Sequence, residues 1–256
     1  RAREYYELSA EQNNSDALNN LRNLYYSGEG VERDYHRARE YYELSAEQNN
    51  SFALFNLGYL YYNGYGVERD YHRAREYYEL SAEQNNSYAL LNLGYLYYKG
   101  EGVERDYNRA REYFELSAKR NNSFALVILG NLYYEGEGVE RDYNRAREYY
   151  ELSAEQNNSF ALNKLGNIYY SGEGVERDYN RAREYYELSA EQNNSDALNN
   201  LRNLYYSGEG VERDYHRARE YYELSAEQNN SFALFNLGYL YYNGYGVERD
   251  YHRARE

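Results

Sequence analysis

Seven asparagines could each carry a covalent sugar. Each begins an Asn-Asn-Ser triplet, which satisfies the Asn-x-Ser pattern for N-glycosylation; they are Asn13, Asn49, Asn85, Asn121, Asn157, Asn193 and Asn229. The triplet also has a structural explanation, because Asn is second only to Gly as the left-handed residue that ends a helix and Ser is a common N-cap. Duplication of one repeat would also copy one triplet. We favour the glycan interpretation, because Gly would end the helix better without creating an acceptor on an exposed turn.

Other patterns that could support ligand binding or catalysis are weak. Gly28-Glu-Gly30 resembles part of a phosphate-binding loop, but Gly-rich pairs are common in turns and the glutamate would repel phosphate. The histidines share one repeat position with asparagines, which is typical of a solvated helix face rather than of a metal ligand or a general base. That position holds His36, His72, Asn108, Asn144, Asn180, His216 and His252.

The carboxylates do not indicate an acid–base pair. They alternate with arginines such as Arg37 and Arg39, as expected for a solvated face whose ion pairs contribute about 0.2–0.5 kcal/mol each. General acid–base catalysis needs two carboxylates in unlike environments, whereas repetition gives equivalent carboxylates like environments. We therefore predict no catalytic, cofactor-binding or metal-binding residue, and an enzyme is the least favoured class.

The composition excludes some classes of binding partner but does not identify the cellular compartment. The chain has 256 residues, 40 of them tyrosine, with a net charge of −14 and a pI near 4.9. This charge argues against nucleic acid and anionic lipid as partners, and no apolar run is long enough to predict membrane insertion. Absence of cysteine excludes a disulfide framework but does not identify the compartment. Because methionine is also absent, we infer that residue 1 is not the translation start.

Internal repetition determines the expected architecture. Arg-Ala-Arg-Glu begins at residue 1 and returns every 36 residues up to residue 253. Residues 181–256 repeat residues 1–76 without a difference, so five distinct repeats form a 180-residue period. Neither end carries the atypical capping repeat that solenoids normally have. We interpret the chain as a window of a longer periodic array; recent duplication within a shortened chain is the alternative.

The predicted organisation is a series of helix–loop–helix repeats with no separate globular domain. A truncated repeat, consisting of its second helix, occupies residues 1–14, and another truncated repeat occupies residues 231–256. The complete repeats between them are residues 15–50, 51–86, 87–122, 123–158, 159–194 and 195–230.

Within residues 51–86 we expect a first helix (helix A), a glycine loop and a second helix (helix B). Ser51 and Asp70 are the predicted N-caps, and Gly64 and Gly66 break the chain between the helices because glycine tolerates positive φ. The expected buried stripe of helix A consists of Phe52, Leu54, Leu57, Leu60 and Tyr61. That of helix B consists of Tyr71, Ala74, Tyr77, Tyr78, Leu80 and Ala82.

Tyrosine pairs recur in both helices, as in Tyr25-Tyr26 and Tyr41-Tyr42. Such pairs could act as platforms on which a sugar or a peptide stacks. At these spacings we expect one tyrosine of each pair to fill the layer between helices. The other is expected to face a groove or a neighbouring chain.

These residues resemble the Sel1-like repeat, a relative of the tetratricopeptide repeat, over the whole chain. The pattern is Ala-x-x-x-Leu-Gly-x-x-Tyr-x-x-Gly-x-Gly-Val-x-x-Asp, followed by Ala-x-x-Tyr-Tyr-x-x-Ser-Ala. The resemblance implies an all-α fold, a right-handed superhelical α-solenoid with a concave face, and a role as a scaffold for protein assembly. In one repeat the pattern is carried by Ala53, Leu57, Gly58, Tyr61, Gly64, Gly66, Val67, Asp70, Ala74, Tyr77, Tyr78, Ser81 and Ala82.

Two positions depart from that family pattern. Arg22 and Arg202 occupy the position of Gly58, so once in every five repeats we expect the helix contact to widen or the arginine to point outward. Asn49 stands where the family pattern usually has a helix-ending glycine.

Two non-enzymatic functions remain open. The favoured one is a long array, forming a filament or surface component by self-association and bearing N-glycans, which predicts an extracellular or cell-surface location. The uncapped super-period and the acceptor triplet in every repeat motivate it.

The alternative is a cytoplasmic adaptor that binds a protein partner on its concave face. Variation in helix A is consistent with it, since Asn19, Phe55, Leu91, Val127 and Asn163 occupy equivalent positions. The near-constant helix B and loop favour the array.

Overall fold

The protein consists of paired α-helices. A computed structural model describes residues 2–228 and 230–255, and these residues form helices, turns and loops but no strand. In chain order the helices are α1 (Ala2–Ala10), α2 (Ser15–Ser27), α3 (Tyr35–Glu47), α4 (Ser51–Asn63), α5 (Tyr71–Glu83), α6 (Ser87–Lys99), α7 (Tyr107–Lys119), α8 (Ser123–Glu135), α9 (Tyr143–Ala154), α10 (Ser159–Ser171), α11 (Tyr179–Ala190), α12 (Ser195–Ser207), α13 (Tyr215–Glu227) and α14 (Ser231–Asn243).

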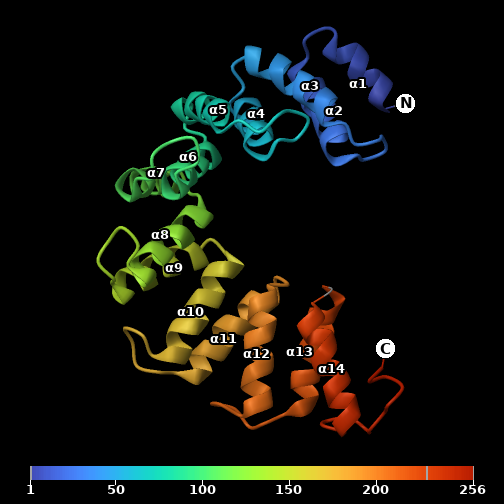
Figure 1. Ribbon diagram of the computed structural model, residues 1–256, viewed down its shortest axis with the longest axis vertical. Helices are drawn as coiled ribbons and strands as arrows, with labels where there is room; N and C mark the ends of the chain where they lie inside the picture. The colour runs from blue at the N-terminus through green and yellow to red at the C-terminus, as the bar shows by residue number, and fades with distance from the viewer. Residues whose placement is uncertain (1, 229, 256) are drawn as a thin grey trace. The chain divides into compact units, whose positions relative to one another are not determined.

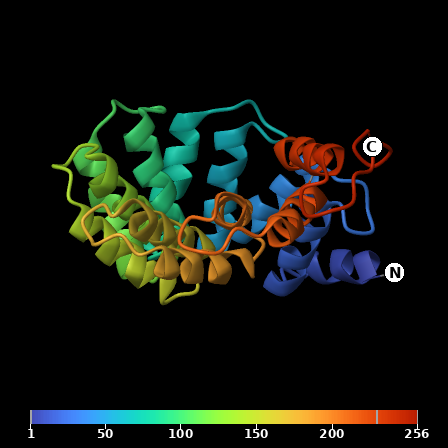
Figure 2. The same ribbon diagram turned by 90° about the horizontal axis from the view of Figure 1, so that it is seen from below.

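The helices form two compact units, Arg1–Ala125 and Leu126–Glu256. The first unit holds α1 to α7 and the start of α8, and the second holds the rest of α8 and α9 to α14. Within each unit consecutive helices lie side by side (Figures 1 and 2), with helix A and helix B alternating. Each complete repeat contributes one pair of helices joined by a loop.

Side-chain caps fix where these helices begin. The predicted cap of helix B is confirmed: Asp70 accepts hydrogen bonds from the backbone N–H groups of His72 at 2.9 Å and Arg73 at 3.1 Å. The predicted cap of helix A is wrong by one residue. Asn50, rather than Ser51, accepts from Phe52 N at 3.0 Å, because asparagine caps at least as well as serine and precedes it here.

Small residues bring helix A and helix B close together, as expected. A methyl group on Gly58 of α4 would lie 3.1 Å from the carbonyl oxygen of Ala74 and 2.6 Å from the Tyr78 ring of α5. Ala74 and Tyr78 are fully buried. Neighbouring repeats then close the core, where Tyr78 packs with Leu93 and Leu96 of α6.

Two residues expected in the core are exposed. Phe52 is 55% exposed because it lies on the side of α4 opposite the buried Leu54 and Tyr61. Leu80 is 47% exposed because helix B presents only a narrow stripe to its neighbours, and Ser81 is buried in its place. The Ser81 hydroxyl donates to the carbonyl oxygen of Ser51 at 2.6 Å, which joins the end of helix B to the start of helix A.

In the complete repeats one tyrosine of each pair is buried, as predicted, whereas neither member of Tyr5-Tyr6 or Tyr241-Tyr242 is buried. Tyr25 and Tyr42 are inside, whereas Tyr26 and Tyr41 are half-buried. Across the repeat the rings of Tyr25 and Tyr41 stack with centroids 5.8 Å apart. The same stack follows in the later repeats, for example between Tyr61 and Tyr77 at 5.7 Å.

Candidate functional site

Both asparagines of the Asn-Asn-Ser turn shape the junction between helix B and the next helix A. Asn49 has φ of +60°, and the Asn49 and Asn50 N–H groups donate to the carbonyl oxygens of Ala46 at 2.8 Å and Ser45 at 3.3 Å. This is the bonding of a Schellman motif, in which a left-handed residue ends a helix. Asn50 also caps α4. One residue thus closes helix B while the next opens helix A.

The six described acceptor asparagines share this conformation and are exposed. Their φ values lie between +57° and +63°, for Asn13, Asn49, Asn85, Asn121, Asn157 and Asn193. Asn229 lies outside the described residues. The backbone roles of the two asparagines are therefore sufficient to explain why they occur in every repeat. Attachment of sugar stays a prediction.

Residues of the next repeat bind these turns. Gln84 Nε2 donates to Asn49 Oδ1 at 3.0 Å, and in the second unit Gln192 Nε2 donates to Asn157 Oδ1 at the same distance. Arg120 donates to Asn85 Oδ1 in the repeat that replaces the glutamine. Hydrogen bonds to the side-chain oxygens of these asparagines therefore join the turns of consecutive repeats.

The Gly-x-Gly loop is a packing element between repeats. A methyl group on Gly66 would lie 2.7 Å from Tyr35 Cβ in the preceding repeat. In the next loop, Glu101 Oε2 accepts a hydrogen bond from Tyr62 Oη at 2.7 Å. The glutamate of this loop therefore serves as an acceptor for the preceding repeat.

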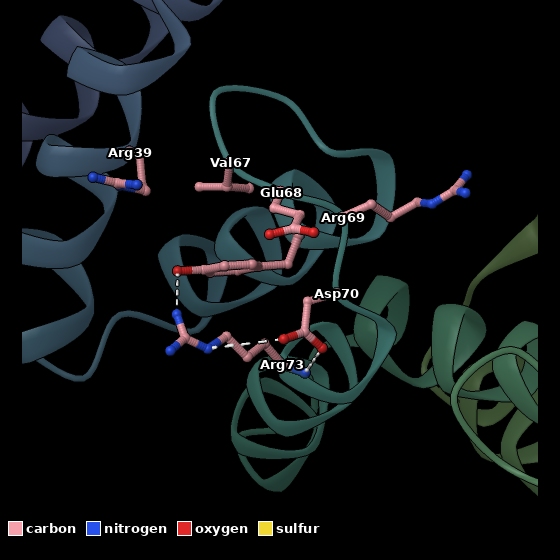
Figure 3. Close-up of a pocket in the computed structure, with 7 residues that line it drawn as sticks. Arg39, Val67, Glu68, Arg69, Asp70 and Arg73 are labelled. Atoms are coloured by element: carbon pink, nitrogen blue, oxygen red, sulfur yellow. Dashed lines mark hydrogen bonds and ion pairs between the residues drawn. The ribbon is translucent and has the colours of Figure 1, made fainter.

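A charged pocket of about 530 Å³ opens beside this loop (Figure 3). Arg39 enters it from α3, while Val67, Glu68 and Asp70 lie on the loop that leads into α5. Equivalent pockets lie beside the loops around Val31, Val103 and Val211. The pocket is thus a property of the repeat rather than of one place in the chain.

Most charged groups in this pocket already have partners. Arg73 Nη1 donates to Tyr61 Oη at 3.1 Å, and this bond is the main cause that raises the pKa of Arg73. Arg39 Nε lies 3.3 Å from Glu43 Oε1. The lining of this pocket holds no serine, cysteine or histidine side chain. Mixed charges that already bind one another fit a solvated junction between repeats.

Helix A carries a face that differs from repeat to repeat. Seven of its thirteen positions vary among the repeats, and five of these fall within roughly 100° of one another at 100° per residue. We call this the variable face; in α4 it consists of Phe52, Phe55, Asn56, Tyr59 and Asn63. The remaining two varying positions hold Gly58 and Leu60, which face the core.

The variable face of the first unit exposes an aromatic cluster. Phe55 of α4 lies 6.4 Å from Tyr59 and 5.9 Å from Tyr88 of α6, between ring centroids. Tyr59 in turn lies 6.2 Å from Tyr65 on the loop. Phe52 and Tyr88 are about half exposed. Exposed aromatic side chains of this kind are enriched at protein interfaces.

The arginine that replaces Gly58 is buried, so of the two expected arrangements, a widened helix contact or an outward arginine, the outward one is not found. Arg22 is only 8% exposed, with its guanidinium carbon 5.2 Å from the centre of the Tyr42 ring. In the second unit Arg202 lies 4.8 Å from the Tyr222 ring. The attraction of a cation for an aromatic face accounts for this burial. The expected difference in packing every five repeats is found.

The histidine position is solvated as predicted, since His36 and His72 are exposed. Among the described residues, no group of His, Cys, Asp and Glu is arranged to hold a metal ion. None of the described helices is both long and apolar enough to cross a bilayer.

A family model described as Sel1 repeat matches the chain along its whole length. The matched segments are residues 1–14, 15–50, 51–86, 87–122, 123–158, 159–194, 195–230 and 231–256. The chain belongs to the Sel1 repeat family. The predicted all-α fold of repeating helix–loop–helix units is confirmed. No curated protein sequence matches the chain.

Solved structures of the Sel1 class share this fold. A Sel1 repeat protein from Oxalobacter formigenes is 32% identical over 94% of this chain and 96% of its own, with a TM-score of 0.83. A protective antigen of uropathogenic Escherichia coli, with an SLR fold, is 35% identical with a TM-score of 0.80. The match covers 98% of this chain and 54% of the antigen, so the chain spans about half of that protein.

An immunity protein from Pseudomonas aeruginosa shares the fold at 24% identity. That match has a TM-score of 0.55 and covers 75% of this chain and 74% of the other.

Sequence reasoning missed two contacts of this Sel1 protein that join its repeats. Gln84 and Glu101 bind the preceding repeat at its turn and at its tyrosine pair. Their near-constancy among repeats, at positions expected to be solvated, was the available signal.

Proposed function

We propose that this Sel1 repeat protein is a non-enzymatic scaffold that binds a protein partner through the variable face of helix A. The observation that carries the proposal is the confinement of most helix A differences to that one face. Helix B, the loop and the turn are almost constant because they join the repeats. A surface that is free to vary and rich in exposed aromatic rings suits recognition of a partner.

The aromatic cluster around Phe55 is the expected anchor. Interface energy is concentrated in a few aromatic or arginine residues, each of which costs more than about 1 kcal/mol when truncated. Another repeat provides polar residues that occur naturally at the positions of this cluster. Asp16, Asn19 and Asn23 occupy the positions of Phe52, Phe55 and Tyr59.

Selection of displayed random peptides on the full chain tests the proposal. Peptides selected on the native chain should lose binding to the triple variant, which carries Phe52→Asp, Phe55→Asn and Tyr59→Asn in α4 and the same three changes at Phe232, Phe235 and Tyr239 of its copy α14. The control His72→Asn introduces the asparagine native to helix B of later repeats and should bind as before. Equal binding to the triple variant would overturn the proposal.

A second candidate is the self-associating, glycan-bearing array. It is supported by the 180-residue period, in which residues 181–256 repeat residues 1–76 without a difference. The array hypothesis predicts that copies of the chain contact one another through the exposed aromatic residues of helix A. Sedimentation velocity should then show association that grows with concentration and falls in the variant Phe232→Asp, Phe235→Asn. A concentration-independent single species would contradict it.

Glycosylation is tested separately by peptide mapping of the native protein. Asn49 uses Oδ1 towards Gln84, and its Nδ2, the atom that would carry sugar, has no hydrogen-bond partner among the described residues. Sugar at Asn49 and its equivalents would support the array and an extracellular or cell-surface location. Unmodified asparagine in every copy would contradict the glycan prediction and favour the cytoplasmic adaptor.

A further inference from the structure

One loop in every five repeats carries a tyrosine instead of a glutamate. Tyr65 and its copy Tyr245 occupy the position of Glu29, Glu101, Glu137, Glu173 and Glu209. Three of these glutamates accept a hydrogen bond from a tyrosine of the preceding repeat: Glu101 from Tyr62, Glu173 from Tyr134 and Glu209 from Tyr170. A phenol ring at this position replaces that contact with a different one.

The Tyr65 ring stacks on Tyr35 of the preceding repeat. Their centroids are 4.9 Å apart and their planes 12° from parallel. Tyr245 and Tyr215 repeat the stack at 5.3 Å and 22°. Close backbone packing at Gly66, where a methyl group would lie 2.7 Å from Tyr35 Cβ, holds the loop and α3 in this register.

This stack is also open to solvent. Tyr65 is 36% exposed and Tyr35 is half-buried. The other parallel tyrosine stacks, such as Tyr61 with Tyr77, have one ring almost completely buried. A dissolved oxidant can therefore reach Tyr65 and Tyr35 together, which it cannot do at the buried stacks.

We propose that Tyr35 with Tyr65, and Tyr215 with Tyr245, are sites of oxidative dityrosine cross-linking between repeats. A peroxidase using hydrogen peroxide removes one electron and one proton from each phenol. The two radicals join through the ring carbons next to the hydroxyl carbons, and each displaced ring proton returns to an oxygen. Two hydrogen atoms leave in total, which reduce one hydrogen peroxide to two waters. The bond provides a covalent link in a chain without cysteine, independently of the proposed scaffold function.

Peroxidase treatment of the full chain, followed by tryptic mapping, tests this inference. The expected product joins Asp34–Arg37, which contains Tyr35, to residues 40–69, with fragmentation placing the bond at Tyr65. Peptides 142–145 and 178–181 are internal controls, because Tyr143 and Tyr179 pack against the second glycine of loops that carry a glutamate, at Gly174 and Gly210. They should remain unlinked.

The double variant Tyr65→Glu, Tyr245→Glu carries the residue native to the other loops. It should keep its helical circular dichroism while the cross-linked peptide and dityrosine fluorescence are lost. A cross-linked peptide that persists in this variant would overturn the proposal. So would bonds confined to dimers whose yield rises with protein concentration.

Discussion

Asn49 Oδ1 accepts a hydrogen bond from Gln84 Nε2 at 3.0 Å, although the two residues lie in consecutive repeats. The contact links two turns that have the same Schellman bonding. It gives the acceptor asparagine a role that glycine does not have, because glycine has no side-chain oxygen. Asn49 thus sets the backbone of its own turn and also positions the next one.

The two asparagines of a turn should respond differently to substitution. Asn50→Ala removes the cap of α4 and should lower the free energy of unfolding by about 0.5–2 kcal/mol. Asn49→Gly keeps the left-handed backbone, which glycine adopts freely, and loses only the exposed contact with Gln84. Urea denaturation of both variants measures the difference. A larger loss for Asn49→Gly than for Asn50→Ala would show that the hydrogen bond from Gln84 contributes more to stability than the cap of α4.

Packing between repeats at the loop can be separated from backbone strain. Gly102 and Gly30 have φ of +69° and +71°, but a methyl group on Gly102 would lie 2.6 Å from Tyr71 Cβ, whereas one on Gly30 has no neighbour within 4 Å. Both alanine variants carry similar strain from positive φ. Gly102→Ala should therefore cost about 1–3 kcal/mol more, from overpacking, in the same urea measurement. Equal losses would mean that the loop does not pack on the preceding repeat.

Stability should fall at alkaline pH. Burial is the main cause that raises the pKa of Tyr26 and of Tyr221 to about 12 in the folded protein, against about 10 for an unperturbed tyrosine. Between these values the unfolded chain loses phenolic protons that the folded chain keeps, so the free energy of unfolding decreases as pH rises from about 10 to about 12. Denaturation across this range, with Tyr26→Phe as the matched variant, measures the effect. Constant stability up to pH 12 would contradict it.

Much of the fold could be predicted because the 36-residue period and the helix caps can both be read directly from the sequence. Asp70 caps helix B as expected, and Gly58 with Ala74 allows the close helix contact. The helix A cap was misplaced because Asn50 and Ser51 are adjacent residues that both cap well. Phe52 and Leu80 were misassigned because their burial depends on which neighbouring helix covers them, and hydrophobicity alone does not specify that.

The candidate site was only partly predictable for a related reason. Variation at the position of Phe55 could be read from aligned repeats, and the helical period places the other varying positions beside it. The aromatic cluster, however, joins Phe55 to Tyr88 of the next repeat. Such contacts depend on how one repeat stacks on another, which no single repeat encodes.

The most direct measurement is calorimetric titration of a peptide selected on the native chain, with hydrogen exchange to locate it. We expect protection of α4 and α6, and an affinity lower by at least about tenfold, which corresponds to about 1.4 kcal/mol, in the triple variant that carries Phe52→Asp, Phe55→Asn, Tyr59→Asn and the same changes in α14. His72→Asn should bind with unchanged affinity. Protection confined to helix B or to the loops, with equal affinity for the triple variant, would contradict a partner-binding role for the variable face.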